Sequence, residues 1–285
     1  MHSYGRAGPV ARLAAGGVPT VSTLPDPDTA VNGWRERVRA MLEEKTAVRS
    51  ARLLAPSDAL RRHYAELWST PVEVIPNFLD VPAFKERLVA TPRGQARMRL
   101  GVAPDDIVLL YVGRGHPGKG LDRLMEAFQI ARIEHGPLRL FLTGKESGIA
   151  PARAVAESLD LGDAVVVLGV VEGVAPLYAA ADVFVLPSCP EGWSMALLEA
   201  MTAGLPAVTT SEGGIPDPAS VSTAVLVEDE APEALARGIL ELTTDPQRRV
   251  DLGRAAAARA AELDAAVWTP QLEQLYADVI RISEE

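Results

Sequence analysis

Short aliphatic runs alternate with longer amphipathic stretches along most of the sequence, and this alternation limits the fold more than any other feature. Most runs end at a glycine, a proline or a polar residue, as strands do, and the stretches between them have helical spacing. Strands that alternate with helices build βαβ units and therefore parallel sheets. The sequence accordingly predicts an α/β protein. The predicted strands cover residues 20–24, 52–57, 72–77, 106–113, 138–144, 164–169, 182–188, 206–210 and 223–228.

The runs fall into two groups, and each group predicts a Rossmann-like, doubly wound domain. The segment "IPNFLD", followed by Pro82, indicates a strand end and a change of direction near residue 80. We expect domains over residues 1–80 and 81–265, with a helix over 266–285 that packs back on the first domain. The first group holds only three or four strands and lacks the glycine-rich turn that opens such sheets, so we expect an incomplete N-terminal domain.

Composition argues against several classes of protein. The net charge of −10 leaves no basic surplus to neutralise nucleic-acid phosphates. Cys189 is the single cysteine, which rules out an internal disulfide and favours a cytoplasmic location. The longest apolar region is broken by charges and prolines, so it predicts strands and a helix and not a membrane span.

A glycine-rich loop with two cations follows the strand predicted at 106–113. Its sequence, "GRGHPGKG", begins at Gly113 and contains Arg114 and Lys119. A loop at the carboxyl end of a parallel strand, before a helix, can bind an anion such as a diphosphate. Taken alone, an exposed turn with two solvated cations explains the loop equally well, and His116 beside a proline more often contacts solvent than a phosphate.

Two glutamates, Glu191 and Glu199, flank the start of a predicted helix in "PEGWSMALLEAM". Ser194 is suited to be the N-cap of this helix, with the apolar Trp193 before it. Glu191 then lies in the loop at the carboxyl edge of the sheet. Glu199 lies one to two turns into the helix among apolar residues, where a carboxylate is costly unless it is bonded. A ligand contact and a solvent-facing position both remain open for Glu199.

These segments together resemble the retaining glycosyltransferases of the GT-B fold, and specifically glycosyltransferase family 4. The resemblance rests on "GR…GKG", "EGWSMALLEAM", "GGIP", "IPN" and "LYAAADVFVLPS", which occur in the order seen in that family. It covers residues 50–280 well and residues 1–50 more loosely. It implies two Rossmann-like domains, the second of which binds a nucleotide-diphosphate sugar.

The resemblance also implies a role for each residue that matches the motifs. Arg114 and Lys119, after Gly113, would bind the donor diphosphate, and Glu199 would accept hydrogen bonds from the ribose hydroxyls. Glu191 would face the transferred sugar. The sugar and its phosphate would also meet the backbone N–H groups of Gly192, Trp193, Ser194 and Met195. The base would lie against Gly169 and Val170.

The implied reaction needs no divalent metal and no cofactor besides the donor substrate. Charge develops on the leaving diphosphate, where fixed cations and helix-start N–H groups stabilise it. No Asp-x-Asp motif occurs near the site; Asp26 and Asp28 match the pattern but belong to the other domain, where a turn explains them.

Three features depart from the family. The N-terminal domain lacks its opening strands. Pro25 stands where family members often carry a histidine, with His2 near the edge of the same sheet. Trp193 and Ser194 replace the commoner Phe-Gly, which would narrow the space beside the sugar.

These departures leave open how the N-terminal domain would bind an acceptor. We expect a glycosyltransferase that works as a homo-oligomer or with a partner chain, because missing strands would expose a sheet edge; peripheral membrane contact is compatible with this. The alternatives are a non-catalytic nucleotide-sugar-binding or regulatory subunit, and a different α/β sugar-phosphate enzyme. The sequence names neither the sugar, the base nor the acceptor.

Overall fold

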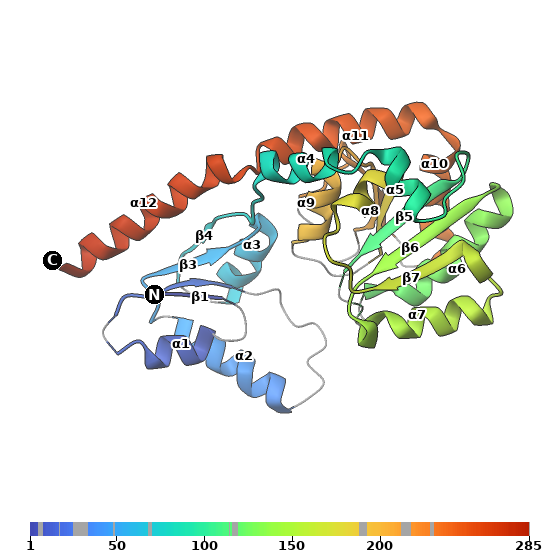
Figure 1. Ribbon diagram of the computed structural model, residues 1–285. Helices are drawn as coiled ribbons and strands as arrows, with labels where there is room; N and C mark the ends of the chain where they lie inside the picture. Colours follow the sequence, from blue (N-terminus) through green and yellow to red (C-terminus); the bar gives the residue numbers. More distant parts are fainter. Residues whose placement is uncertain are drawn as a thin grey trace. The chain divides into compact units, whose positions relative to one another are not determined.

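The computed structural model forms two compact units, drawn in Figure 1. The first unit comprises residues 1–78 and 265–285, and the second comprises residues 79–264. The structure describes residues 1–4, 8–16, 18–24, 34–47, 49–67, 70–113, 115, 119–187, 193–211, 218–228 and 231–284.

The first unit is built on a four-stranded parallel sheet in the order β1-β2-β3-β4. Its strands are β1 (His2–Tyr4), β2 (Val21–Thr23), β3 (Arg52–Ala55) and β4 (Val72–Val74). The sequence did not predict β1, because three residues are too few to show a strand period. Its helices are α1 (Gly8–Ala14), α2 (Trp34–Ala47), α3 (Asp58–Leu67) and α12 (Ala265–Glu284).

Consecutive residues of β3 bury opposite faces of this first sheet. Leu53 packs in a cluster with residues of α2 and α3, whereas Leu54 packs with Leu275 and Val279 of α12. A strand that is apolar at neighbouring positions is expected in a parallel sheet that is covered on both faces. The helix that ends the chain therefore belongs to the unit that begins it.

The second unit contains a six-stranded parallel sheet in the order β10-β9-β8-β5-β6-β7. β5 lies between β6, which follows it in sequence, and β8, so the strand order reverses there. Open α/β sheets bind ligands outside the carboxyl ends of the strands at such a reversal. The strands are β5 (Ile107–Val112), β6 (Leu138–Thr143), β7 (Val165–Gly169), β8 (Val183–Leu186), β9 (Ala207–Thr210) and β10 (Ala224–Val227).

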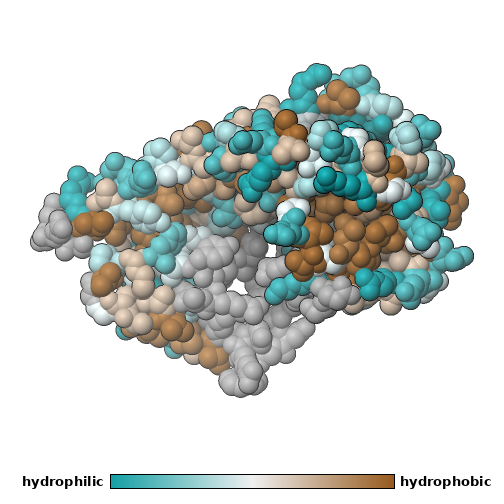
Figure 2. All heavy atoms as spheres, viewed as in Figure 1, coloured by the Kyte–Doolittle hydropathy of each residue, from teal (hydrophilic) through white to brown (hydrophobic). Residues whose placement is uncertain are grey.

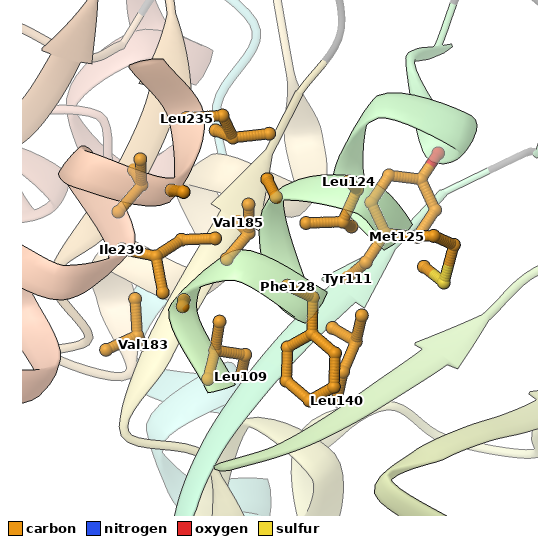
Figure 3. Close-up of a cluster of buried hydrophobic side chains, with 14 of the residues drawn as sticks. Leu109, Tyr111, Leu124, Met125, Phe128, Leu140, Val183, Val185, Leu235 and Ile239 are labelled. Carbon is orange, nitrogen blue, oxygen red and sulfur yellow. The ribbon is translucent and has the colours of Figure 1, made fainter. Parts of the chain in front are cut away.

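Helices cover both faces of this second sheet. Figure 3 shows one face, where Leu109 and Tyr111 of β5 meet Phe128 of α6 and Ile239 of α10. On the other face, Val108 and its neighbours pack with residues of α4, α8 and α9. The helices of the unit are α4 (Val81–Val89), α5 (Arg93–Arg99), α6 (Leu121–Glu134), α7 (Glu146–Ser158), α8 (Ala175–Ala180), α9 (Met195–Thr202), α10 (Pro232–Thr244) and α11 (Pro246–Ala261).

β7 is the edge strand of the second sheet and is half-buried along its whole length. Figure 2 shows hydrophobic side chains at the surface where Figure 1 draws β5, β6 and β7.

Among the described helices, none combines the length and the apolar character that crossing a membrane requires.

Side chains also fasten the amino ends of β5 and β8 in the second unit. The Asp182 carboxylate accepts a hydrogen bond from the Val108 backbone N–H at 2.9 Å and ion pairs with Arg97 at 3.1 Å and Arg93 at 2.6 Å. Arg97 is buried and also donates to the carbonyl of Ala180 at 3.2 Å. α5 is therefore tied to the two strands at which the order of the sheet reverses.

Candidate functional site

Glycines allow the carboxyl ends of β5, β6 and β7 to approach closely. The Gly113 N–H donates to the Thr143 carbonyl at 3.1 Å, and the Gly144 N–H donates to the Gly169 carbonyl at 3.0 Å. A Cβ atom on Gly144 would overlap the Gly113 carbonyl oxygen, and one on Gly113 would lie 2.6 Å from the Tyr111 hydroxyl. These three strand ends are therefore fixed by backbone contacts that leave no room for side chains.

The start of α6 lies against the carboxyl end of β8. Gly120 adopts φ 63° and ψ 28°, in the left-handed region, and a Cβ there would overlap the Pro187 carbonyl oxygen. The same carbonyl accepts a hydrogen bond from Arg123 Nη2 at 3.2 Å. Lys119, half-buried, directly precedes this turn. The described end of the cationic loop thus meets the end of β8 at the strand reversal.

α9 begins as the sequence predicts. The Ser194 side chain accepts a hydrogen bond from the Leu197 N–H at 3.3 Å, which confirms Ser194 as the N-cap. Trp193 is buried, and among the described residues its indole N–H has no partner. Met195, the first helical residue, is 37% exposed. The helix therefore starts against the core, with its first side chain at the surface.

Glu199 lies one turn into α9 and is half-buried. Its Oε2 atom accepts a hydrogen bond from the Tyr178 hydroxyl at 2.9 Å. Burial raises the pKa of the Glu199 carboxyl, whereas the Tyr178 hydrogen bond and the positive charge of Arg87 act to lower it. A bonded, half-buried carboxylate is neither a solvated surface group nor a neutral core residue.

The end of β7 presents a bend in the chain to solvent. Gly169 has φ 72°, and its carbonyl also accepts a hydrogen bond from the Thr143 hydroxyl at 2.7 Å. Val170, the next residue, is 75% exposed. The peptide after β7 is therefore fixed by β6, while the Val170 side chain is exposed.

Four residues considered for the site lie outside the part of the chain that the structure describes: Arg114, His116, Glu191 and Gly192. Cys189, Pro25, Asp26 and Asp28, discussed above for other reasons, also lie outside it. The described residues at the carboxyl edge of the second sheet are Gly113, Lys119, Gly169, Val170, Trp193, Ser194 and Met195, and Glu199 follows one turn into α9.

Sequence reasoning missed Tyr178 and Arg123. Tyr178 belongs to the segment "LYAAADVFVLPS", but no regular spacing relates it to Glu199, 21 residues later. Arg123 follows the cationic loop and resembles a solvated residue in a helix. Within the described ranges, no group of histidine, cysteine, aspartate and glutamate side chains is arranged to hold a metal ion.

Two curated relatives of this chain have the same name. A D-inositol 3-phosphate glycosyltransferase from Kineococcus radiotolerans is 34% identical over 245 residues, which cover 78% of this chain and 56% of the relative. A protein of the same name from Thermobispora bispora is 29% identical over 258 residues, or 85% of this chain and 59% of the relative. The chain thus spans a little over half the length of these relatives.

Solved structures share the fold at low sequence identity. Sucrose-phosphate synthase (tll1590) from Thermosynechococcus elongatus has a TM-score of 0.84 at 21% identity, covering 99% of this chain and 73% of that chain. Anabaena Alr3699/HepE in complex with UDP-glucose has a TM-score of 0.83 at 21% identity, covering 97% of this chain and 78% of that chain. This likeness confirms the predicted GT-B-like α/β fold.

Two family models match consecutive parts of the sequence. A glycosyl transferase 4-like domain matches residues 1–77, and glycosyl transferases group 1 matches residues 93–259. The second match covers more than half of the 285 residues and includes Lys119, Tyr178 and Glu199. The chain therefore belongs to the family of glycosyl transferases group 1.

Proposed function

We propose that this chain is a retaining, metal-independent glycosyltransferase that moves a sugar from a nucleotide-diphosphate sugar to an acceptor hydroxyl. The observation that carries this proposal is the Glu199 carboxylate, held half-buried beside the strand reversal by the Tyr178 hydroxyl. The family, the glycosyltransferase relatives and a structural neighbour solved with UDP-glucose support it.

Glu199 is suited to bind the ribose. Oε2 accepts from Tyr178, and among the described residues no other donor bonds to this carboxylate. Oε1 can therefore accept a hydrogen bond from a vicinal diol of the ligand. A hydrogen bond to a charged acceptor contributes about 1.5–3 kcal/mol. The base would then lie against Gly169 and Val170, on the side of β7.

The diphosphate would lie between the start of α6 and the start of α9. Lys119, together with Arg114 outside the described residues, would supply positive charge, and the N–H groups at the start of α9 would add their dipoles. The bond between the anomeric carbon and the diphosphate oxygen breaks, and its electron pair leaves with the diphosphate. Fixed positive groups stabilise that charge where it develops.

The transferred sugar would face Glu191, with the backbone N–H groups of Gly192 to Met195 nearby. The acceptor oxygen forms its bond to the anomeric carbon on the face that the diphosphate leaves, and the acceptor proton passes to the departing diphosphate. This route needs neither a metal ion nor a covalent sugar–enzyme intermediate.

Binding and transfer test this proposal in two steps. Titration calorimetry with UDP, GDP and their sugar conjugates should identify a nucleotide that binds. Glu199→Ala should weaken its binding about 5- to 150-fold, which corresponds to about 1–3 kcal/mol. Glu157→Ala, on the exposed part of α7, is the matched control and should bind as the wild type does. Equal affinities for the wild type and Glu199→Ala would refute the ribose assignment.

The transfer step separates the enzyme from a binding subunit. Glu191→Ala should retain nucleotide affinity and lose sugar transfer. If the wild-type chain binds a nucleotide sugar but transfers nothing, even with candidate partner chains, a non-catalytic binding subunit is the correct function. If neither UDP nor GDP binds at millimolar concentration, the chain is a different α/β enzyme.

We also propose that a second copy or a partner chain covers the edge of the first sheet. β1 pairs with β2 on one side. Beside it, Met1, Val18 and Ile280 are each at least half exposed and line a hollow of about 670 Å³. Exposed strand edges with apolar flanks favour association. Light scattering over a wide concentration range should show a species larger than the monomer; a monodisperse monomer would refute this.

A further inference from the structure

We propose that Tyr178 is a positioning residue for Glu199: its hydroxyl holds the carboxylate charged and oriented to receive the ribose of the nucleotide. This inference rests on the proposed function and extends it to a residue on a different helix. Tyr178 belongs to α8 and Glu199 to α9, so the hydrogen bond joins two helices.

The Tyr178 hydroxyl has one proton and two acceptors within hydrogen-bond distance, both on α9. It lies 2.9 Å from Glu199 Oε2 and 3.0 Å from the Ala196 carbonyl oxygen. Ala196 precedes Glu199 by three residues on the same helix, so the hydroxyl oxygen has a fixed place relative to the backbone that carries the glutamate. A carboxylate that accepts the Tyr178 proton at Oε2 leaves Oε1 available to a ligand.

Burial and aromatic contacts fix the position of the Tyr178 ring. Its side chain is buried, with 1% exposure. The Phe84 ring meets it edge to face, with centroids 5.8 Å apart, and the tilted Phe184 ring has its centroid 6.0 Å away. Aromatic contacts of this geometry stabilise a fixed ring position. The hydroxyl is therefore preorganised before any ligand binds.

The charge of Glu199 depends on its burial and on two groups of the second unit. Burial favours the neutral acid and raises the pKa of Glu199. Tyr178 on α8 and Arg87 on α4 favour the charged form and lower this pKa. Burial and the Glu199 charge raise the pKa of Tyr178 well above its ordinary value, so Tyr178 keeps its proton and remains a donor.

Charged Glu199 is the form that the ribose requires. A carboxylate accepts hydrogen bonds at both oxygens, whereas a protonated carboxyl uses one oxygen as a donor. If burial acted alone, part of the affinity for a diol would be lost as the group became neutral. The Tyr178 hydroxyl opposes this without adding a charge of its own.

The test is Tyr178→Phe, which removes one oxygen atom and keeps the ring and its packing. In the free protein, the pKa of the Glu199 carboxyl should rise, measured by ¹³C NMR of labelled glutamate during a pH titration. UDP or GDP, whichever the wild type binds, should bind about tenfold more weakly to the variant at pH 7. This affinity loss should grow as the pH is lowered.

A double-mutant cycle distinguishes positioning from a general structural role. In a Glu199→Ala background there is no carboxylate to hold, so Tyr178→Phe should change nucleotide affinity by less than about twofold. Tyr276→Phe is the matched control, because it removes a hydroxyl that lies 2.6 Å from His2 Nδ1 in the first unit. It should leave the Glu199 pKa unchanged.

Two results would overturn the inference: an unchanged Glu199 pKa in Tyr178→Phe, or an equal affinity loss with and without the Glu199 side chain. A failure of the proposed function would look different. The wild type would then bind neither nucleotide, and the carboxyl titration alone would decide whether Tyr178 controls Glu199.

Discussion

Replacing Arg97 with methionine should destabilise the second unit by about 3 kcal/mol. The Arg97 side chain is only 10% exposed and pairs with the Asp182 carboxylate at 3.1 Å. Methionine keeps an apolar chain of similar length but removes every donor. The carbonyl oxygens that would lose a hydrogen bond from Arg97 belong to Ala103, Pro104, Asp106 and Ala180.

The size of this loss in stability follows from the hydrogen bonds and ion pairs that each former partner of Arg97 keeps. Breaking a buried ion pair costs about 3–5 kcal/mol when the remaining charge is left unpaired. Asp182 keeps Arg93 at 2.6 Å and the Val108 N–H at 2.9 Å, so its charge is still compensated. The Ala103 carbonyl keeps the Asp106 N–H as a donor at 3.2 Å. The loss therefore comes mainly from the other carbonyl oxygens, and a buried oxygen left without a donor costs about 1–3 kcal/mol. Partial access to water places the total at the lower end of the range.

Arg93→Met is the matched control for Arg97→Met. The Arg93 side chain is 47% exposed, and it contacts the same carboxylate. Arg93 also donates to the Ala179 and Ala181 carbonyls, but its exposure lets water replace these donors. Exposed ion pairs contribute about 0–1 kcal/mol, so this variant should lose only about 1 kcal/mol.

Urea unfolding of both variants, followed by circular dichroism, gives the comparison. The Arg97→Met midpoint should fall at an unchanged slope, because the surface exposed on unfolding is the same. Nucleotide affinity below the transition should stay at the wild-type value, since Arg97 lies at the amino edge of the sheet. A loss below about 1 kcal/mol, or one no larger than that of Arg93→Met, would refute this account of the hydrogen-bond network.

Three further predictions use other parts of the second unit. Ser194→Ala removes the N-cap of α9 and should lower the free energy of unfolding by about 1 kcal/mol in urea. Gly144→Ala places a Cβ against the Gly113 carbonyl and should lower Tm by about 2–10 °C, whereas Gly94→Ala, with open space around it, should not lower Tm. Glu199→Gln should raise stability at pH 7 but not at pH 4. In the wild type, burial raises the pKa of the Glu199 carboxyl in the folded state. The wild type therefore loses stability as the pH rises from the ordinary pKa of 4.5 through the folded-state pKa. Unfolding curves at the two pH values test this.

Strands of the second sheet could be predicted because they are buried on both faces. A strand such as β5 then has an uninterrupted apolar run, with Leu109 on one face and Leu110 on the other. β1 and α1 carry no such signal. β1 has three residues, and α1 is only seven residues long with both Val10 and Leu13 exposed.

The candidate site could be predicted as far as local sequence defines it. Ser194 and Glu199 belong to one helix, so their spacing places the cap and the carboxylate relative to each other. Tyr178 and Arg123 act on partners 21 and 64 residues away, and only the packing of separate elements brings these pairs together. Sequence patterns describe periods within an element and contain no information on such contacts.

The strand reversal between β5 and β8 is held at both ends by side chains. Backbone pairing joins Leu109 with Val183 and Leu110 with Phe184, and the Asp182 N–H donates to the Val108 carbonyl at 2.8 Å. At the amino end, the Asp182 carboxylate bonds the Val108 N–H.

At the carboxyl end, Arg123 of α6 bonds the Pro187 carbonyl. The loops that carry the predicted cations and the first glutamate therefore leave from two strand ends whose separation is set by the protein before any ligand arrives. A diphosphate that spans Lys119 and the start of α9 would bind at a preformed separation, which reduces the free energy that its binding must supply to order the site.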